Sequence, residues 1–273
     1  MAAWPGGSSD IPESHDRVAQ YTAKIRALGV EIVDTIPALL DKVDVVLVES
    51  IDGRPHLEQA LAAIEARKPL FIDKPVAGSL ADAIKIFEAA DKFGVPCFSS
   101  STLRFGEDIS AALRPERVGK VLGCETHGPC SIEPHHPDLF WYGIHGVELL
   151  FTAMGTGCES VIRVHSEGTD MVIGTWKGGR IGSFRGIRQG PYHFGAKIYG
   201  SKTLIDAGGF GGYEPLVVEI VKFFKTGKPP VSAAQTLEIY AFMEAADESK
   251  RQGGTPVKIV DVMSKARNRG AAK

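Results

Sequence analysis

The sequence predicts two domains: an α/β domain with a parallel sheet, then an α+β domain with an open antiparallel sheet and helices on one side. Residues 1–104 alternate helical and strand-like segments, which is typical of a parallel sheet covered on both faces. Residues 105–273 contain strand-like runs joined by glycine turns, which predict consecutive hairpins and therefore an antiparallel sheet. The predicted domains are accordingly 1–104 and 105–273.

The helices of the first domain are predicted from apolar residues spaced three and four apart, and its strands from short apolar runs. The predicted helices are 17–28, 36–40, 54–67 and 80–93, and the predicted strands are 30–33, 43–50, 70–73 and 95–99. The first nine residues are predicted to form a loop. The order strand, helix, strand defines a βαβ unit, whose strand ends meet at the edge where parallel sheets bind ligands.

In the second domain, glycine turns predict two hairpins. Lys177-Gly178-Gly179 separates strands 171–176 and 180–187, and Gly200-Ser201-Lys202 separates strands 196–199 and 203–206. The other predicted elements are a strand at 118–126, helices at 139–154, 215–224 and 235–251, and a last strand at 256–260.

Bulk composition excludes several classes of protein. The formal net charge of −2 gives no attraction to nucleic acid or anionic membranes. No apolar run reaches the roughly 18 residues that a membrane span needs, and residues 1–9 lack the basic and apolar segments of a signal peptide. The 4 cysteines are scattered, which favours reduced thiols over a disulfide framework. We therefore expect a cytoplasmic protein.

Three stretches resemble motifs of the Gfo/Idh/MocA oxidoreductases, the relatives of glucose–fructose oxidoreductase and inositol dehydrogenase. Asp73-Lys74-Pro75 ends a predicted strand, where the family usually has Glu-Lys-Pro. Gly143 to Glu148 is similar to the family's helix with a catalytic His and an acidic residue three positions on, and residues 236–249 resemble its C-terminal helix. The resemblance covers nearly the whole chain. It implies an NAD(P)-dependent oxidoreductase acting on a sugar, inositol or related polyol.

The sequence departs from the family in its first domain. Family members open with a strand and a glycine-rich loop that cradles the pyrophosphate, but no G-x-G-x-x-G follows a predicted strand here. The resemblance therefore implies an N-terminally truncated, Rossmann-like dinucleotide-binding domain that lacks its first βα unit, about 30 residues. That loop and the helix behind it supply backbone N–H donors to the phosphates. We expect NAD or NADP as cofactor, with weakened binding.

Lys74, His145 and Glu148 are the candidate catalytic residues that the resemblance implies. A partly desolvated ammonium at a strand end can hydrogen-bond a developing alkoxide. An imidazole that titrates near neutral pH suits proton abstraction from a secondary alcohol. Because His145 and Glu148 are three residues apart on one predicted helix, they share a face, and Glu148 could orient the ring or contact substrate. The alternative to a catalytic role is a structural one, in which Lys74 is a surface lysine and His145 is a histidine packed in the core.

The candidate cofactor-binding residues follow two predicted strands. The family places the loop after the central strand against the nicotinamide ribose, which suggests Glu49, Ser50, Asp52 and His56, together with Asp73, Lys74 and Pro75. Pro75 fixes the backbone and, as the family suggests, follows a cis bond that directs Lys74 inward. Asp52 is also a good helix N-cap residue, and both roles can hold at once.

A cluster of Cys and His residues precedes the predicted His145 helix. Together with His145 on that helix, its members are Cys124, His127, Cys130, His135 and His136. The Cys-x2-His-x2-Cys spacing could bind zinc, but it matches no standard zinc signature, so no metal ligand is assigned. The favoured interpretation is a substrate-facing loop. His135 and His136 then contact substrate, and Trp141 and Tyr142 stack on a sugar face, although aromatic residues more often pack in the core.

Two other functions stay open at this stage. A noncatalytic relative would keep the second domain for ligand binding or oligomerisation and would have lost dinucleotide binding together with the glycine-rich loop. A metal-dependent lyase or hydrolase would use the Cys/His cluster. In each case the partners would be small molecules. By family analogy, the protein would form a homo-oligomer through its C-terminal sheet.

Overall fold

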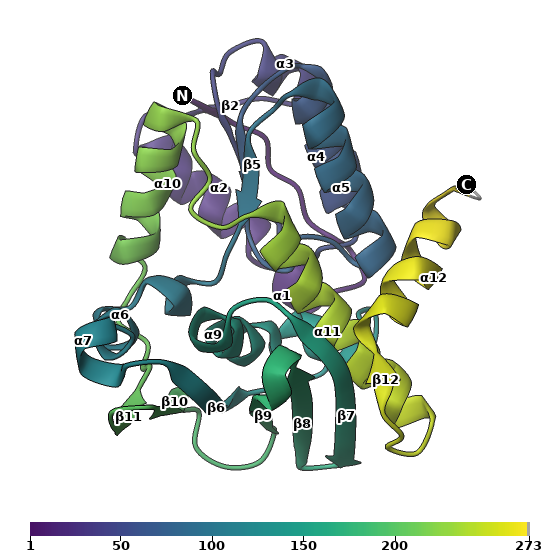
Figure 1. Cartoon of the computed structure of the whole chain (residues 1–273). Helices are drawn as coiled ribbons and strands as arrows, with labels where there is room; N and C mark the ends of the chain where they lie inside the picture. Colours follow the sequence, from purple (N-terminus) through teal and green to yellow (C-terminus); the bar gives the residue numbers. More distant parts are fainter. Residues whose placement is uncertain (272–273) are drawn as a thin grey trace. The chain divides into compact units, whose positions relative to one another are not determined.

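The computed structural model describes residues 1–271 and divides the chain into two compact units. The first comprises Met1–Ser99 with Ile220–Val231, and the second comprises Ser100–Glu219 with the chain from Ser232 onward. The sequence placed its boundary at 104/105 and assigned 220–231 to the second domain. Figure 1 shows the elements coloured along the chain.

The first unit contains five strands in two separate parallel sheets. In one sheet β1 (Ala2–Ala3) pairs with β2 (Glu31–Ile32), and in the other the order is β3 (Val46–Val48), β4 (Leu70–Ile72) and β5 (Cys97–Ser99). The parallel strands were predicted from the sequence. The prediction of a loop for the first nine residues was wrong at Ala2–Ala3, because two residues with small side chains give no apolar run to recognise.

The helices of the first unit lie close to their predicted positions. They are α1 (Pro12–His15), α2 (Val18–Ala27), α3 (Ile36–Leu40), α4 (His56–Glu65) and α5 (Leu80–Phe93). Helix α5 begins where the Ser79 hydroxyl accepts a hydrogen bond from the backbone of Asp82, which stabilises its first turn. Helix α2 buries none of its side chains, although its apolar spacing predicted an amphipathic helix.

A cluster of aromatic rings forms the core beside β4 and β5. Phe71 lies 5.0 Å from Phe98, and Phe98 lies 4.8 Å from Phe223, measured between ring centroids. Phe223 belongs to α10 (Glu214–Thr226), whose later turns are part of the first unit. Ring pairs in tilted and edge-on arrangements are favourable, by about 0.5–1.5 kcal/mol beyond their buried area. This core fixes the strands whose carboxyl ends lead into the candidate residues Glu49, Asp73 and Lys74.

The second unit is built on a seven-stranded mixed sheet of order β11-β10-β6-β9-β8-β7-β12. Only β6 and β9 pair in parallel, so the predicted antiparallel character holds for the other neighbours. Both predicted hairpins are present, and β7 was not predicted. The strands are β6 (Val121–Pro129), β7 (Cys158–Ser166), β8 (Thr169–Trp176), β9 (Ile181–Ile187), β10 (Gly195–Gly200), β11 (Leu204–Ala207) and β12 (Val257–Lys258).

Helices α9 (Ile144–Met154) and α11 (Ala233–Arg251) cover one face of this sheet. Phe151 of α9 and Phe242 of α11 both contact the buried Trp176 ring of β8, at centroid distances of 5.4 and 6.0 Å. The predicted helix 139–154 is two helices, α8 (Asp138–Trp141) and α9. The shorter helical elements are η1 (Thr102–Phe105), α6 (Glu107–Ala112), α7 (Pro115–Val118) and η2 (Lys177–Gly179).

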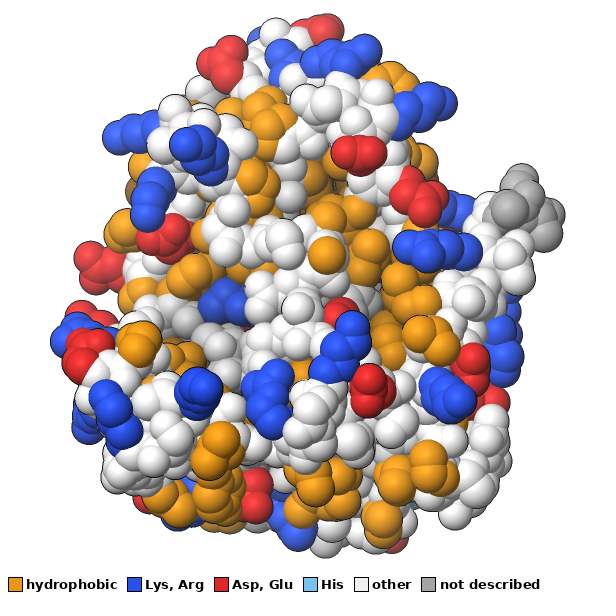
Figure 2. All heavy atoms as spheres, in the orientation of Figure 1, with side chains coloured by type: hydrophobic (Ala, Val, Ile, Leu, Met, Phe, Trp, Pro, Cys, Tyr) orange, Lys and Arg blue, Asp and Glu red, His pale blue; other side chains and the backbone are white. Residues whose placement is uncertain are grey.

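The end of the second unit differs from the prediction. The strand expected to close the chain is only β12, and helix α12 (Ile259–Ala271) follows it directly. Within residues 1–271 no helix is long and apolar enough to span a bilayer. Figure 2 shows acidic and basic side chains interspersed on the face in view, in keeping with the net charge of −2.

A buried ion network ties α8 and α11 to the sheet of the second unit. The fully buried guanidinium of Arg163 donates to Asp170 at 2.8 Å, to Asp138 at 2.9 Å and to Asp247. Burial raises the pKa of Asp247 to about 7, while Arg163 opposes that rise. Because Asp138 begins α8, the network fixes the segment that leads into α9.

Candidate functional site

The carboxyl edge of β3-β4-β5 carries two acidic side chains on neighbouring strands. Val48 pairs with Ile72 in register, and the backbone N–H of Asp73 donates to the carbonyl of Val48 at 2.9 Å. Glu49 and Asp73 therefore leave the sheet side by side. The pKa of Glu49 is raised to about 7, first because the surrounding protein removes water from its carboxylate and second because Asp73 is also negative.

Lys74 lies half-buried beside these acids, and the bond between Lys74 and Pro75 is cis, as the resemblance implied. Burial lowers the pKa of Lys74, and the negative charge of Asp73 opposes that shift. Gly53 lets the following loop approach Pro75 closely. A Cβ atom at residue 53 would meet the Pro75 ring at 2.8 Å and the Ala77 backbone at 2.9 Å.

Ser50 and His56 form hydrogen bonds within the loop that follows β3. The Ser50 hydroxyl donates to the Gln59 side chain at 2.9 Å, and Nε2 of His56 donates to the Ser50 carbonyl at 2.9 Å. His56 is fully buried, and burial lowers its pKa to about 4. It is therefore a neutral residue that holds the loop. Its contact with a cofactor stays a prediction.

Asp52 joins the loops that follow β1 and β3. Its carboxylate accepts hydrogen bonds from Ser8 and from the backbone and guanidinium of Arg54, and Arg54 also binds Asp10 with two N–H groups. Because Asp52 is only 1% exposed, its visible role is to fix these loops. The backbone bond to Arg54 is the local hydrogen bonding typical of Asp in a turn.

In the second unit, His145 lies at the first turn of α9 among aromatic side chains. Its Nδ1 is 2.8 Å from the Ser101 hydroxyl. The Tyr142 and Phe194 rings contact the imidazole edge-on, at centroid distances of 5.2 and 5.7 Å. Gly128 makes room for Phe194, since a Cβ atom there would lie 2.6 Å from its ring. These contacts fix the orientation of the imidazole.

Glu148 is buried on the same helix but is bonded to other residues. Its Oε1 accepts hydrogen bonds from the Ser100 hydroxyl and from Nε of Arg104, both at 2.7 Å. Both donors come from the segment that also carries Ser101. The carboxylate therefore anchors this segment to α9, and direct contact with a substrate stays a prediction.

The predicted substrate residues before α9 lie in different environments. His135 is exposed and its ring is bonded to Glu133, whereas His136 is buried, with its ring 5.0 Å from that of Trp141. Tyr142 is half-buried, and burial raises the pKa of its phenol, followed by the nearby phenols of Tyr213 and Tyr192. The Tyr142 ring contacts the His145 imidazole edge-on.

The Cys/His cluster does not assemble into a metal centre. No group of three or more His, Cys, Asp or Glu side chains arranged to hold a metal occurs in the part of the chain that the structure describes. All four cysteines are buried free thiols, and burial raises the pKa of each to about 12. A thiol that resists ionisation is a poor metal ligand.

Sequence reasoning missed Ser100, Ser101, Phe194, Tyr192 and Tyr213. A signal for the serines was available, because the run Ser99-Ser100-Ser101-Thr102 follows a third predicted strand, as polar residues follow the other two. The aromatic residues had no such signal. They lie in the loops before β10 and α10, far from His145 in the sequence, and only the fold places them near Tyr142.

Comparisons with known proteins agree with this architecture. Residues 12–101 match the model of the oxidoreductase family GFO_IDH_MocA with an NAD-binding Rossmann fold. A probable dehydrogenase from Thermotoga maritima is 22% identical, with a TM-score of 0.76 over 90% of each chain. The apo scyllo-inositol dehydrogenase from Lactobacillus casei is 13% identical, with a TM-score of 0.76 over 89% of this chain and 88% of that one. No curated protein sequence matches the chain.

A further structural match is GenD2 from gentamicin A biosynthesis, solved in complex with NAD. It is 18% identical, with a TM-score of 0.74 over 87% of this chain and 85% of that one. The chain therefore has the two-domain fold of these dehydrogenase structures, a Rossmann-like parallel sheet followed by a mixed sheet with helices. The family match over residues 12–101 therefore agrees with the resemblance predicted from the sequence, and the similar structures agree with the predicted two-domain fold.

Proposed function

We propose that this protein is an NAD(P)-dependent oxidoreductase acting on a sugar, an inositol or a related polyol, in which Lys74 and His145 handle the hydrogen on the reacting oxygen. The observation that carries the proposal is Lys74 itself, a half-buried ammonium with a lowered pKa where a parallel strand ends. A group of this kind can share its proton with an alkoxide more readily than an exposed lysine.

The residues at the strand ends fit a nicotinamide cofactor in part. Parallel sheets bind ligands at their carboxyl edges, and this edge carries Glu49, Asp73 and Lys74. The residues fit the pyrophosphate of the cofactor less well, because the 273 residues contain no G-x-G-x-x-G motif to bind it. A bound NAD(P) would accept or supply the hydride. The contribution of the protein is then to orient the substrate and to hold the proton at Lys74.

Cofactor binding can be tested directly by isothermal titration with NADH and NADPH. We expect a saturable isotherm for one of them, and Lys74→Met should change its affinity. Lys85→Ala on α5 is the matched control, because this partly exposed lysine faces Asp82 of the same helix and should leave binding unchanged. Dissociation constants no better than millimolar for both cofactors would contradict the proposal.

A second candidate is a noncatalytic relative that has lost dinucleotide binding. The observation that favours it is the division of the parallel strands into two sheets, β1-β2 and β3-β4-β5, together with the lack of the glycine motif. It predicts that a polyol binds without cofactor and that no hydride transfer follows. Equilibrium dialysis with radiolabelled myo-inositol, with and without NADH, separates the two candidates, because the oxidoreductase should bind polyol more tightly when the cofactor is present.

We also propose that the protein forms a homo-oligomer through the open face of the second unit's sheet. Apolar side chains point outward from three neighbouring strands, namely Ile162, Val164, Met171, Ile173 and Ile181. Val164 is 63% exposed and Ile181 58% exposed. A second copy presents the same apolar surface, so a two-fold pair is self-complementary.

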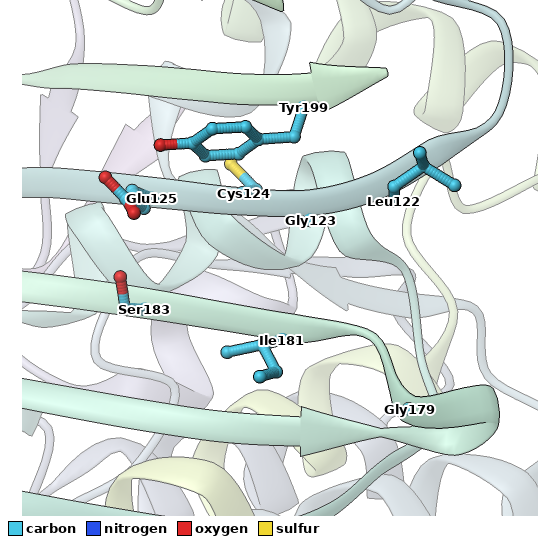
Figure 3. A pocket seen from close by; sticks show the side chains of 8 residues that line it. All are labelled: Leu122, Gly123, Cys124, Glu125, Gly179, Ile181, Ser183 and Tyr199. Atoms are coloured by element: carbon cyan, nitrogen blue, oxygen red, sulfur yellow. The ribbon is translucent and has the colours of Figure 1, made fainter. Parts of the chain in front are cut away.

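A shallow groove on the same face adds to this surface. It has a volume of about 330 Å³ and lies beside β6 and β9, and Figure 3 shows Tyr199, Ile181, Glu125 and Ser183 lining it. Light scattering coupled to size exclusion should report a dimer or larger for the wild type. Ile173→Lys should give monomers, and a wild-type monomer at high micromolar concentration would contradict the proposal.

The free thiols are consistent with a cytoplasmic location, which we propose as well.

A further inference from the structure

The hydrogen-bond partners of Ser101 determine how His145 is protonated. Within residues 1–271, the Ser101 hydroxyl makes two hydrogen bonds, accepting one from the backbone N–H of Leu103 at 3.3 Å and contacting Nδ1 of His145 at 2.8 Å. A serine hydroxyl has one proton to donate. Because the Leu103 bond uses Oγ as an acceptor, the proton of Ser101 is left for the imidazole.

The alternative arrangement leaves a buried donor without an acceptor. If Nδ1 of His145 carried the proton, both contacts of Ser101 Oγ would be accepting ones, and its own O–H would point at no acceptor. Ser101 is 1% exposed, so water does not replace the missing partner. Buried polar hydrogens are almost always hydrogen-bonded. The arrangement in which Ser101 donates to Nδ1 is therefore favoured.

Ser101 is held in this orientation by its neighbours. It is the N-cap of η1, where its hydroxyl accepts a hydrogen bond from the backbone N–H of Leu103 in the first turn. The adjacent Ser100 hydroxyl donates to Glu148 and contacts the Ser101 carbonyl, and Arg104 closes the segment by donating to the same carboxylate. The segment is thus attached to α9 at two points, one at His145 and one a helical turn later at Glu148.

We propose that neutral His145 carries its proton on Nε2 and presents an N–H donor, and that Ser101 is the positioning residue that sets this tautomer. A neutral imidazole of this kind polarises a carbonyl oxygen or stabilises a developing alkoxide by a hydrogen bond, and it does not abstract a proton. Resting on the proposed function, this assigns proton transfer to Lys74 and leaves His145 to orient and stabilise the reacting oxygen.

A carboxylate in place of the serine would reverse the arrangement. An aspartate at residue 101 can only accept, so it would draw the proton to Nδ1 and leave Nε2 as an acceptor, as carboxylate partners of histidine do. Ser101→Asp is therefore expected to invert the tautomer, and Ser101→Thr, which keeps the hydroxyl, is expected to preserve it.

The test is two-dimensional NMR of the full chain labelled with ¹⁵N at histidine, recorded at a pH where the ring is neutral. The His145 signals are assigned by their loss in His145→Gln. We expect the protonated nitrogen to be Nε2 in the wild type and in Ser101→Thr, and Nδ1 in Ser101→Asp. Ser100→Ala is the matched control, because it removes the neighbouring hydroxyl that bonds Glu148 and should leave the tautomer unchanged.

A wild-type ring protonated at Nδ1 would overturn the proposal, and so would an unchanged pattern in a folded Ser101→Asp. If that variant does not fold, Ser101→Ala replaces it and should give a mixture of both tautomers. Since the measurement needs neither cofactor nor turnover, a protein that fails to bind NAD(P) can still show the expected tautomer. Failure of the proposed function and failure of this inference are therefore distinguishable.

Discussion

Glu49 and Asp73 leave adjacent parallel strands at the same level, because Val48 and Ile72 are paired in register. Two carboxylates are thereby held side by side at the edge where the sheet would bind a ligand. Although Glu49 is exposed at the surface, the protein atoms around its carboxylate raise its pKa to about 7, and the negative charge of Asp73 adds to this rise. Carboxyl groups with raised pKa values are common at functional sites, and this edge is therefore the candidate site in the proposed function.

Glu49→Gln should change how stability depends on pH. A carboxyl group whose pKa is 4.5 when unfolded and about 7 when folded binds more protons in the folded state over that interval. The free energy of unfolding should therefore fall as pH rises from about 4.5 to about 7 in the wild type, and this fall should be smaller in the variant. Urea unfolding across this range measures it. Glu65→Gln, at the exposed end of α4, should keep the wild-type profile.

Lys74→Met should stabilise the fold at neutral pH while removing activity. Because burial lowers the pKa of Lys74 below 10.5, charging this group costs free energy in the folded state at neutral pH. The wild type should gain stability as pH rises through the lowered value, and the methionine variant should lack this gain. Thermal unfolding at neutral and alkaline pH is the measurement. A variant less stable than the wild type at neutral pH would count against a desolvated ammonium.

Arg163→Met should destabilise the second unit strongly. Removing the guanidinium leaves Asp247 buried without this partner and leaves Asp170 with only Arg188 and His165 among the partners described, and breaking a buried ion pair in this way costs about 3–5 kcal/mol. Urea unfolding gives the difference in free energy. Arg251→Ala is the matched control, because its pair with Glu248 is exposed and should contribute at most about 1 kcal/mol. Similar losses in both variants would contradict the importance of the network.

Gly53→Ala should disturb the segment that carries Lys74. The added Cβ would lie 2.9 Å from the backbone of Ala77, which cannot move aside as a flexible side chain would. We expect at least a tenfold loss in kcat/KM, about 1.4 kcal/mol, with the fold retained by circular dichroism. Gly209→Ala adds the same atom where no other atom lies within 4 Å, so it should keep the wild-type activity.

Local patterns in the sequence predicted much of the fold and part of the site. The helices and strands of the first unit follow from apolar spacing, and the two hairpins of the second follow from their glycine turns. Strand β7 was missed because the buried Arg163 interrupts its apolar alternation, and its three acidic partners are distant in the sequence. Only the fold shows why a charged residue can occupy that position.

The positions of the candidate residues could be predicted best where they follow from the backbone alone. Lys74 and Pro75 follow a strand, so their place at the sheet edge could be derived from residues nearby. The surroundings of His145 could not, because Ser101 and Phe194 reach it from segments 44 and 49 residues away. Side chains brought together by tertiary packing leave no periodic signal in one sequence.

The proposed function requires hydride transfer that depends on Lys74. The direct measurement is the formation of reduced nicotinamide, followed by its absorbance, when the protein is mixed with NAD⁺ or NADP⁺ and a panel of inositols and sugars. We expect one cofactor and at least one polyol to give turnover that Lys74→Met lowers by at least a hundredfold and Lys85→Ala leaves unchanged. Turnover that survives in Lys74→Met would contradict the central claim.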